Sequence, residues 1–141
     1  MKIITYFLRL TSEKLFKFKL FYIAGLLSSI RASLLLRKIT KVKYDGEDWI
    51  YKWNGSAAVS SVCYYNPCLN YSDSDLFFFK YKPKNGDIIV DIGVENGSEI
   101  PEFCKSVGDN GKVFAIEADP LCYRRLRKLK NILNLNNLIL I

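Results

Sequence analysis

From residue 83 onward the chain alternates short apolar runs with amphipathic segments. Three runs have the length and composition of β-strands: Asp87–Ile92, Val113–Ile116 and Leu138–Ile141. The first is apolar almost throughout, which predicts a strand buried on both faces. Between the runs, Ile100–Val107 and Cys122–Leu133 place apolar residues three and four positions apart, as on one face of a helix. Alternating strands and helices with short loops predict an α/β fold, a doubly wound parallel sheet with right-handed crossovers.

The middle of the chain predicts a β-hairpin over Asp48–Tyr65. Trp49, Tyr51 and Trp53 occupy alternate positions, as on one face of a strand, and Asn54-Gly55 is a favoured two-residue turn. Such an aromatic face either stacks on a ligand or packs into a core, and packing is the commoner outcome.

A polar stretch and a short apolar stretch connect this hairpin to the α/β part. Residues 66–75 are rich in turn-forming residues and predict a loop. Leu76–Tyr81 predicts a short helix, which Pro83 cannot continue.

The most hydrophobic long run of the chain is Leu20–Leu36. It has seventeen residues with Arg31 among them, fewer than the roughly 20 apolar residues of a membrane-spanning helix. Residues at helical spacing form an amphipathic stripe on it: Leu20, Ile23, Leu27, Ile30 and Leu34. We expect this helix to pack on its own domain, and an interfacial membrane helix or a signal anchor are the alternatives.

Positive charge is concentrated in the first 43 residues. The chain carries a net charge of +7, yet residues 1–43 hold ten basic residues and one acidic residue, a net +9, which leaves −2 for the rest. Such an excess indicates either a solvated helix surface or a binding site for an anionic membrane or nucleic acid. We therefore divide the chain into a basic amphipathic helical arm (1–43), a β-hairpin and linker region (44–82) and the α/β part (83–141).

Four cysteines, no Cys-x-x-Cys pair and no histidine limit the chemistry of the chain. A Ser–His or Cys–His catalytic pair is impossible within it, and no metal site is expected. Reduced cysteines are favoured, which predicts a cytoplasmic protein, with membrane association through the arm as the alternative.

The loop after the first predicted strand, in DIIVDIGVENGSEI, indicates a ligand. Ligands of parallel sheets bind beyond the carboxyl ends of the strands, and Gly93 and Gly97 would let the backbone approach one closely. The phosphate-loop and dinucleotide patterns are both absent. Glu95 and Glu99 would repel a pyrophosphate at this helix start. They can hold a positively charged nucleoside, and S-adenosylmethionine brings both a sulfonium and an ammonium.

A carboxylate also ends the second predicted strand. Glu117 lies 26 residues after Asp91, where it can accept hydrogen bonds from both ribose hydroxyls. Alone, it could equally be an ordinary charge at a helix start. Together with Asp91, Gly93 and Gly97 at the preceding strand end, ligand binding is the favoured interpretation.

At these residues the sequence resembles class I S-adenosylmethionine-dependent methyltransferases, most closely the FkbM-type family. The segments that carry the resemblance are GDIIVDIGVENGSEI, VGDNGKVFAIEADP, LRKLKNILNLNNL and the lead-in FFFKYKPKNGD. The resemblance implies a Rossmann-like sheet in which Asp91, Gly93 and Gly97 line the methionine end of the cofactor. It also implies that Glu117 holds the ribose, with Ala118 and Asp119 near the adenine.

This resemblance covers 76–141, under half of the chain. Enzymes of this type are associated with methyl transfer to hydroxyl groups of sugars or metabolites, which implies a small-molecule or glycan acceptor. The class has a seven-stranded sheet, so we expect this chain to correspond to the cofactor-binding, N-terminal part of such a domain, truncated after the third strand. No catalytic residue is assigned.

Two other functions remain open. The first is a non-catalytic Rossmann-like binding module whose basic arm docks on a membrane or nucleic acid. The second is a methyltransferase that modifies nucleic acid; it is the less favoured, because the α/β part has neither a basic excess nor a base-stacking motif.

Overall fold

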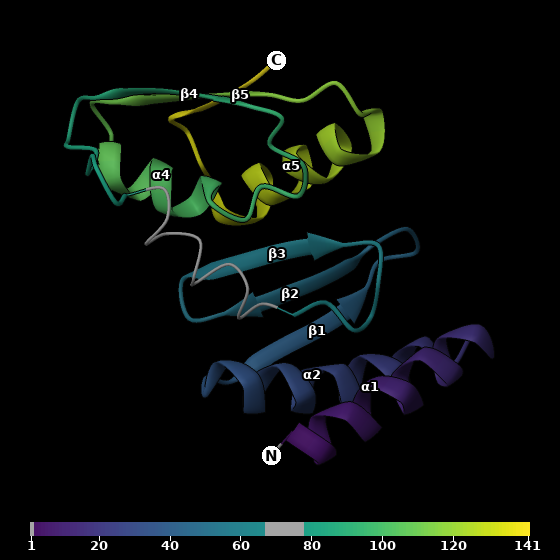
Figure 1. Cartoon of the computed structure of the whole chain (residues 1–141). Coiled ribbons are helices and arrows are strands. Elements are labelled where there is room, and N and C mark those ends of the chain that lie inside the picture. The colour runs from purple at the N-terminus through teal and green to yellow at the C-terminus, as the bar shows by residue number, and fades with distance from the viewer. Residues whose placement is uncertain (1, 67–77) are drawn as a thin grey trace. The chain divides into compact units, whose positions relative to one another are not determined.

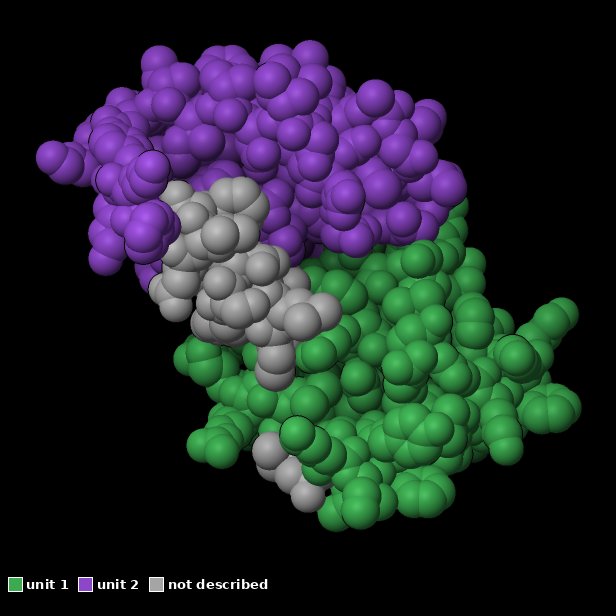
Figure 2. Space-filling view, in the orientation of Figure 1, with its two compact units in different colours: residues 1–68 green, residues 69–141 purple. Residues whose placement is uncertain are grey.

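A computed structural model describes residues 2–66 and 78–141, which fall into two compact units, Met1–Cys68 and Leu69–Ile141 (Figure 2). The predicted boundaries at 43/44 and 82/83 fall inside these units. Each unit has its own hydrophobic core, and each is described separately.

The first unit begins with a helical hairpin (Figure 1). Helix α1 (Lys2–Lys17) and helix α2 (Phe21–Leu36) are joined by a tight turn, in which the backbone N–H of Leu20 donates to the carbonyl of Leu15 at 2.9 Å. Helix α2 ends where Arg37 adopts a left-handed conformation, with φ of 53°.

A three-stranded antiparallel sheet completes this unit, formed by β1 (Thr40–Tyr44), β2 (Trp49–Trp53) and β3 (Ser56–Ser60). The predicted hairpin is confirmed, because β2 pairs with β3 across Asn54 and Gly55. Gly55 supplies the positive φ, 71°, that this turn needs. Strand β1 was not predicted, since it lies at the end of the segment interpreted as a helical arm.

The aromatic face of β2 forms the core of the first unit. Trp49 and Tyr51 are fully buried and Trp53 nearly so, which confirms packing as their role. Phe16 of α1 lies edge-on to Trp49, with ring centroids 5.6 Å apart, and Phe21 of α2 stacks on Tyr44 at 4.6 Å. These aromatic contacts join both helices to one face of the sheet.

Helix α2 packs through a different face from the one that the periodicity favoured. Its small residues Ala24, Ser28 and Ala32 are buried, whereas Leu20, Ile23, Ile30 and Leu34 of the predicted stripe are exposed. The reason is a close approach between helix and sheet: a β-carbon added at Gly25 would lie 3.0 Å from the carbonyl oxygen of Val42 on β1. Large side chains do not fit in that space. The helix does pack on its own unit, but by a different face.

Among the described helices, none combines the length and the hydropathy needed to cross a bilayer.

The second unit is a three-stranded parallel sheet in the order β4-β5-β6, with one helix after each of the first two strands. Its elements are β4 (Ile88–Ile92), α4 (Ile100–Val107), β5 (Lys112–Ile116), α5 (Pro120–Leu133) and β6 (Leu138–Leu140). All three strands and both helices of the sequence prediction are thereby confirmed, with small shifts at their ends. The core lies between the sheet and the helices, where Ile100 and Val107 of α4 meet Leu126 of α5 and Val113 of β5.

Two expectations for this unit were wrong. Both described helices of this unit cover the same face of the sheet (Figure 1), so neither of them covers the other face. As a result β4 is not buried on both faces: Ile88, Val90 and Ile92 are 68%, 59% and 76% exposed. The predicted helix Leu76–Tyr81 is also absent from its described part, 78–81, which forms a turn and bends. The rest of that helix, and nearly all of the predicted loop at 66–75, lie outside the described residues.

Asn137 joins the C-terminal end of α4 to the start of β6. Its buried side-chain amide donates to the carbonyls of Cys104 at 2.8 Å and Gly108 at 2.9 Å. Each of these carbonyls also accepts one backbone N–H at 3.2 Å, from Gly108 and Gly111 respectively, so the side chain supplies a second donor to both. Asn137 therefore contributes to stability although it lies far from the loops at the carboxyl ends of the strands.

We expect Asn137→Ala to lower the free energy of unfolding by about 1–3 kcal/mol, because two buried hydrogen bonds are lost at about 0.5–1.5 kcal/mol each. Urea denaturation followed by circular dichroism measures the change. Asn136→Ala, at the exposed neighbouring position, is the matched control and should change stability by less than about 0.5 kcal/mol. Equal effects of the two substitutions would contradict this role for Asn137.

Candidate functional site

The predicted site residues gather at the carboxyl edge of the parallel sheet. Strands β4 and β5 are neighbours, with Ile92 paired to Ile116 at their ends. The loop after β4 (93–99) and the loop after β5 (117–119) therefore start side by side. Ligands of open parallel sheets bind at this edge.

Two glycines shape the first loop in different ways. Gly93 and Gly97 both have positive φ, 80° and 65°, which other residues rarely adopt. A β-carbon at Gly97 would overlap the side chain of Leu126 on α5, whereas one at Gly93 would meet nothing within 4 Å. Gly97 thus allows the loop to pack on the helix, and Gly93 leaves open space at the end of β4.

The residues between the glycines hold the loop in place. Val94 is buried in the core of the unit, and its carbonyl accepts the N–H of Gly97 at 2.9 Å. Glu95 has a left-handed backbone with φ of 51°, a strained state for a residue with a side chain. Its side chain is exposed, and its backbone N–H points to the neighbouring strand end.

Glu117 ties the two loops together. One oxygen of its carboxylate accepts the backbone N–H of Glu95 at 2.7 Å, and the other accepts that of Asp119 at 2.7 Å. An ionised carboxylate offers about four acceptor positions, so each oxygen can accept a further hydrogen bond. The side chain is only partly buried. This geometry suits a group that binds a pair of hydroxyls while its orientation is fixed by the backbone.

Asp119 has a structural role at the start of α5. Its carboxylate accepts the backbone N–H groups of Leu121 and Cys122, both at 2.8 Å, and so caps the N-terminus of α5. The hydrogen bond from Cys122, the largest contribution, helps to hold the pKa of Asp119 below its ordinary value. Ala118 is exposed beside it. A place for Ala118 and Asp119 near an adenine stays a prediction.

Asp91 and Glu99 form a second pair of carboxyl groups, beneath the loop. Their carboxyl groups lie close enough to interact, and burial raises the pKa of both above the ordinary values. The hydroxyl of Ser98 donates to Glu99 at 2.6 Å. Among the described residues, no donor reaches the buried Oδ2 atom of Asp91. Two half-buried carboxyl groups in contact favour sharing one proton, or binding a cation in its place.

The structure thus brings the predicted residues together as two pairs, Glu95 with Glu117 and Asp91 with Glu99. The sequence placed all four at the strand ends but did not show how they pair. Ser98 was missed, because a lone serine at a helix start has no distinctive pattern. Within the described ranges no three cysteine or acidic side chains converge on a possible metal position.

No protein family matches this chain, and no curated protein does. Segments of several solved structures are similar to it. A structure described as a SAM-dependent methyltransferase from Aquifex aeolicus is 23% identical and covers 55% of this chain and 46% of its own, with a TM-score of 0.45. A putative rRNA methylase from Clostridium thermocellum is 28% identical over 55% and 40% of the two chains, with a TM-score of 0.43.

Fibrillarin of Aeropyrum pernix, in complex with natively bound S-adenosyl-L-methionine, is 19% identical over 74% of this chain and 46% of its own, with a TM-score of 0.42. The matched segments span less than half the length of each of these three chains.

Proposed function

We propose that this chain binds S-adenosylmethionine at the carboxyl edge of its parallel sheet, as the cofactor-binding part of a methyltransferase. The observation that carries the proposal is the position of Glu117. Its carboxylate stands at the end of β5, fixed by two backbone N–H groups, next to the open space at Gly93. A ribose there would place its two hydroxyls on the remaining acceptor positions.

The charges around the first loop support the methionine end of the same ligand. The contacting pair Asp91 and Glu99 can exchange a shared proton for the ammonium group of the cofactor. Glu95, exposed at the loop tip, adds negative charge nearby. A dinucleotide or a nucleoside triphosphate would bring negative charge to the same place and be repelled.

We further propose an FkbM-like O-methyltransferase, acting on a hydroxyl of a sugar or small metabolite. Bound at this edge, the cofactor would supply an electrophilic methyl group to the acceptor oxygen, with the thioether as leaving group and the hydroxyl proton passing to water. The residues of this chain bind and orient the cofactor, and none of them is assigned as the base. The motif residues Asp91, Gly93, Gly97 and Glu117 support this narrower proposal.

Calorimetric titration of S-adenosylmethionine into the full chain tests the proposal. We expect saturable binding that Glu117→Ala weakens by about 1–3 kcal/mol, because the ribose hydroxyls lose their acceptor. Glu102→Ala, at an exposed position in the first turn of α4, is the matched control and should leave binding unchanged. A chain that is folded by circular dichroism and binds no S-adenosylmethionine would overturn the proposal.

A further inference from the structure

The helical hairpin of the first unit turns its large apolar side chains away from its own sheet. On α1 the exposed residues include Ile3, Ile4 and Phe7, and on α2 they include Tyr22, Ile23, Leu26, Ile30 and Leu34. Tyr22 is 86% exposed and Ile3 is 73% exposed. Helices that face water on one side normally present polar residues there.

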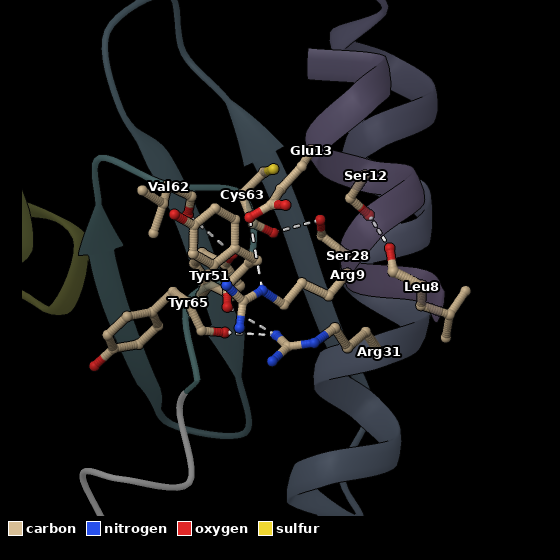
Figure 3. Close-up of polar contacts among 11 residues, drawn as sticks. Leu8, Arg9, Ser12, Glu13, Ser28, Arg31, Tyr51, Val62, Cys63 and Tyr65 are labelled. Atoms are coloured by element: carbon tan, nitrogen blue, oxygen red, sulfur yellow. Dashed lines mark hydrogen bonds and ion pairs between the residues drawn. The ribbon is translucent and has the colours of Figure 1, made fainter. Parts of the chain in front are cut away.

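Small and polar residues make up much of the inward side of the same hairpin. Thr5 and Ser12 of α1 and Ser28 of α2 are buried, together with Ala24 and Ala32. Figure 3 shows the hydroxyl of Ser12 donating a hydrogen bond to the carbonyl of Leu8, and that of Ser28 donating to the carbonyl of Cys63. Arg31, on the same side of α2, donates to the carbonyls of Tyr64 and Tyr65 at 3.0 Å. Phe16 and Phe21 also pack inward, but many of the largest aliphatic side chains of the hairpin lie outside, where a solvent-facing hairpin would present polar groups.

Positive charge surrounds this apolar face. Six lysine and arginine residues are exposed on the two helices or at their ends: Lys2, Lys14, Lys17, Lys19, Arg37 and Lys38. Lys41 and Lys43 of β1 are also exposed, but they alternate with the buried Val42 and so lie on the face of the sheet opposite the helices. The single acidic residue in 1–43, Glu13, is ion-paired with Arg9 at 3.6 Å. Of the ten basic residues in this segment, all but the buried Arg31 are exposed.

A shallow hollow at the C-terminal end of α2 combines both properties. It has a volume of about 480 Å³ and lies between Ile30, Leu34 and Ile39, with Arg37 and Lys38 at its edge. Ile39 is 86% exposed. In an anionic lipid the acyl chains adjoin the charged headgroup. An apolar surface next to basic side chains therefore fits such a lipid.

We propose that the outward face of the α1–α2 hairpin docks on the surface of an anionic lipid bilayer. Nucleic acid would account for the charge but not for eight exposed large apolar side chains. A second copy would bring the same positive charge and be repelled. Only an anionic membrane surface is complementary to both properties, and helices too short to span it would lie in its interface. The proposal concerns the first unit and does not depend on cofactor binding.

Co-sedimentation of the full chain with lipid vesicles tests the proposal. We expect binding to vesicles that contain phosphatidylglycerol, and about tenfold weaker binding to pure phosphatidylcholine vesicles or at high salt. Absence of binding to the anionic vesicles by a folded chain would overturn the proposal. The proposal would also be overturned if single-stranded RNA displaced the protein from the vesicles and the apolar substitutions described next did not change vesicle binding.

Paired substitutions separate the apolar and electrostatic contributions. Leu26→Ser with Ile30→Ser should lower vesicle partitioning about tenfold. These exposed side chains would be partly buried in the bilayer, and serine loses that part of the free energy of transfer from water. Val90→Ser with Ile92→Ser makes the same kind of change at exposed positions of β4 and should leave it unchanged. Lys14→Glu with Lys38→Glu should also lower partitioning about tenfold or more, and Lys80→Glu with Lys82→Glu should lower it much less.

A reporter at the surface tests the orientation directly. Trp49 and Trp53 are buried, so Tyr22→Trp adds a fluorophore whose emission should shift to the blue on vesicle binding and be quenched by brominated lipid. An unshifted emission in the vesicle-bound protein would overturn the proposed orientation. A dimer in sedimentation equilibrium that Leu26→Ser with Ile30→Ser dissociates would instead make the face an interface between copies, and would overturn the proposal as well.

Discussion

Replacing Gly97 by alanine is expected to destabilise the second unit by about 2–6 kcal/mol. The backbone of Gly97 has a φ of 65°, and a residue with a side chain costs of order 1–3 kcal/mol in such a region. The new β-carbon would also overlap the side chain of Leu126. Leu126 is fully buried between α5 and the sheet, so it cannot move away without disturbing the core, which adds a further 1–3 kcal/mol or so. Urea denaturation monitored by circular dichroism measures the loss.

Gly93→Ala is the matched comparison, since it makes the same chemical change four residues earlier. Gly93 also has positive φ, but a β-carbon there would meet nothing within 4 Å. We expect a cost of about 1–2 kcal/mol from the backbone alone. Its main effect should be on S-adenosylmethionine binding, because the β-carbon would occupy the space proposed for the cofactor. Equal stability losses for the two variants, or unchanged binding by Gly93→Ala, would contradict these separate roles.

The second unit could be predicted from sequence because its signals are local. Ile100, Phe103, Cys104 and Val107 recur at helical spacing and are all buried, and Asp119-Pro120 marks the start of α5 through its capping side chain. The parallel order follows from alternating strands and helices with short loops. The exposed face of β4 could not be predicted, because an apolar strand does not show which of its faces the helices cover.

The first unit was predicted less well because its packing depends on distance between elements. Periodicity favours the face of α2 with the largest apolar residues, but the helix approaches β1 so closely that only Gly25 and its small neighbours fit. Strand β1 depends on its pairing with β2, from Thr40 opposite Trp53 to Tyr44 opposite Trp49. Neither the approach nor the pairing leaves a pattern within a single segment.

The candidate site could likewise be predicted only where its features are local in the sequence. Glycines and carboxylates at strand ends are visible in the sequence, because parallel topology fixes where strand ends meet. The contact of Asp91 with Glu99 and the hydrogen bond from Glu95 to Glu117 depend on the path of the loop, which Val94 directs by entering the core.

Replacing Asp91 by asparagine should stabilise the protein at neutral pH and weaken cofactor binding. The folded protein holds the pKa values of Asp91 and Glu99 above the ordinary 3.8 and 4.5, chiefly by burial. Between the ordinary and the raised pKa values, the folded protein therefore binds more protons than the unfolded chain. The stability from this pair is fully present below about pH 4 and is lost as the pH rises through the raised pKa values. An asparagine amide can donate to the carboxylate of Glu99 at any pH, which removes this loss.

We expect Asp91→Asn to raise the free energy of unfolding by about 1 kcal/mol at pH 7 and to change it little at pH 4. Urea denaturation at the two pH values measures this, and Asp109→Asn, at an exposed turn position, is the control. The same substitution removes a carboxylate proposed to face the ammonium group, so S-adenosylmethionine should bind about tenfold more weakly. Adenosine, which lacks the methionine part, should bind the variant and the unmodified chain equally.

Opposite signs for stability and binding are what distinguish a ligand-binding carboxylate pair from a structural one. A pair retained for stability would become weaker at pH 7 when one member is neutralised, because Glu99 would lose a partner that had stabilised it. Two carboxylates that hold a cation repel each other when no cation is bound. Neutralising one of them removes this repulsion and stabilises the protein, but it weakens ligand binding. Loss of stability at pH 7 in Asp91→Asn would therefore contradict the proposed role of the pair, even if S-adenosylmethionine still bound through Glu117.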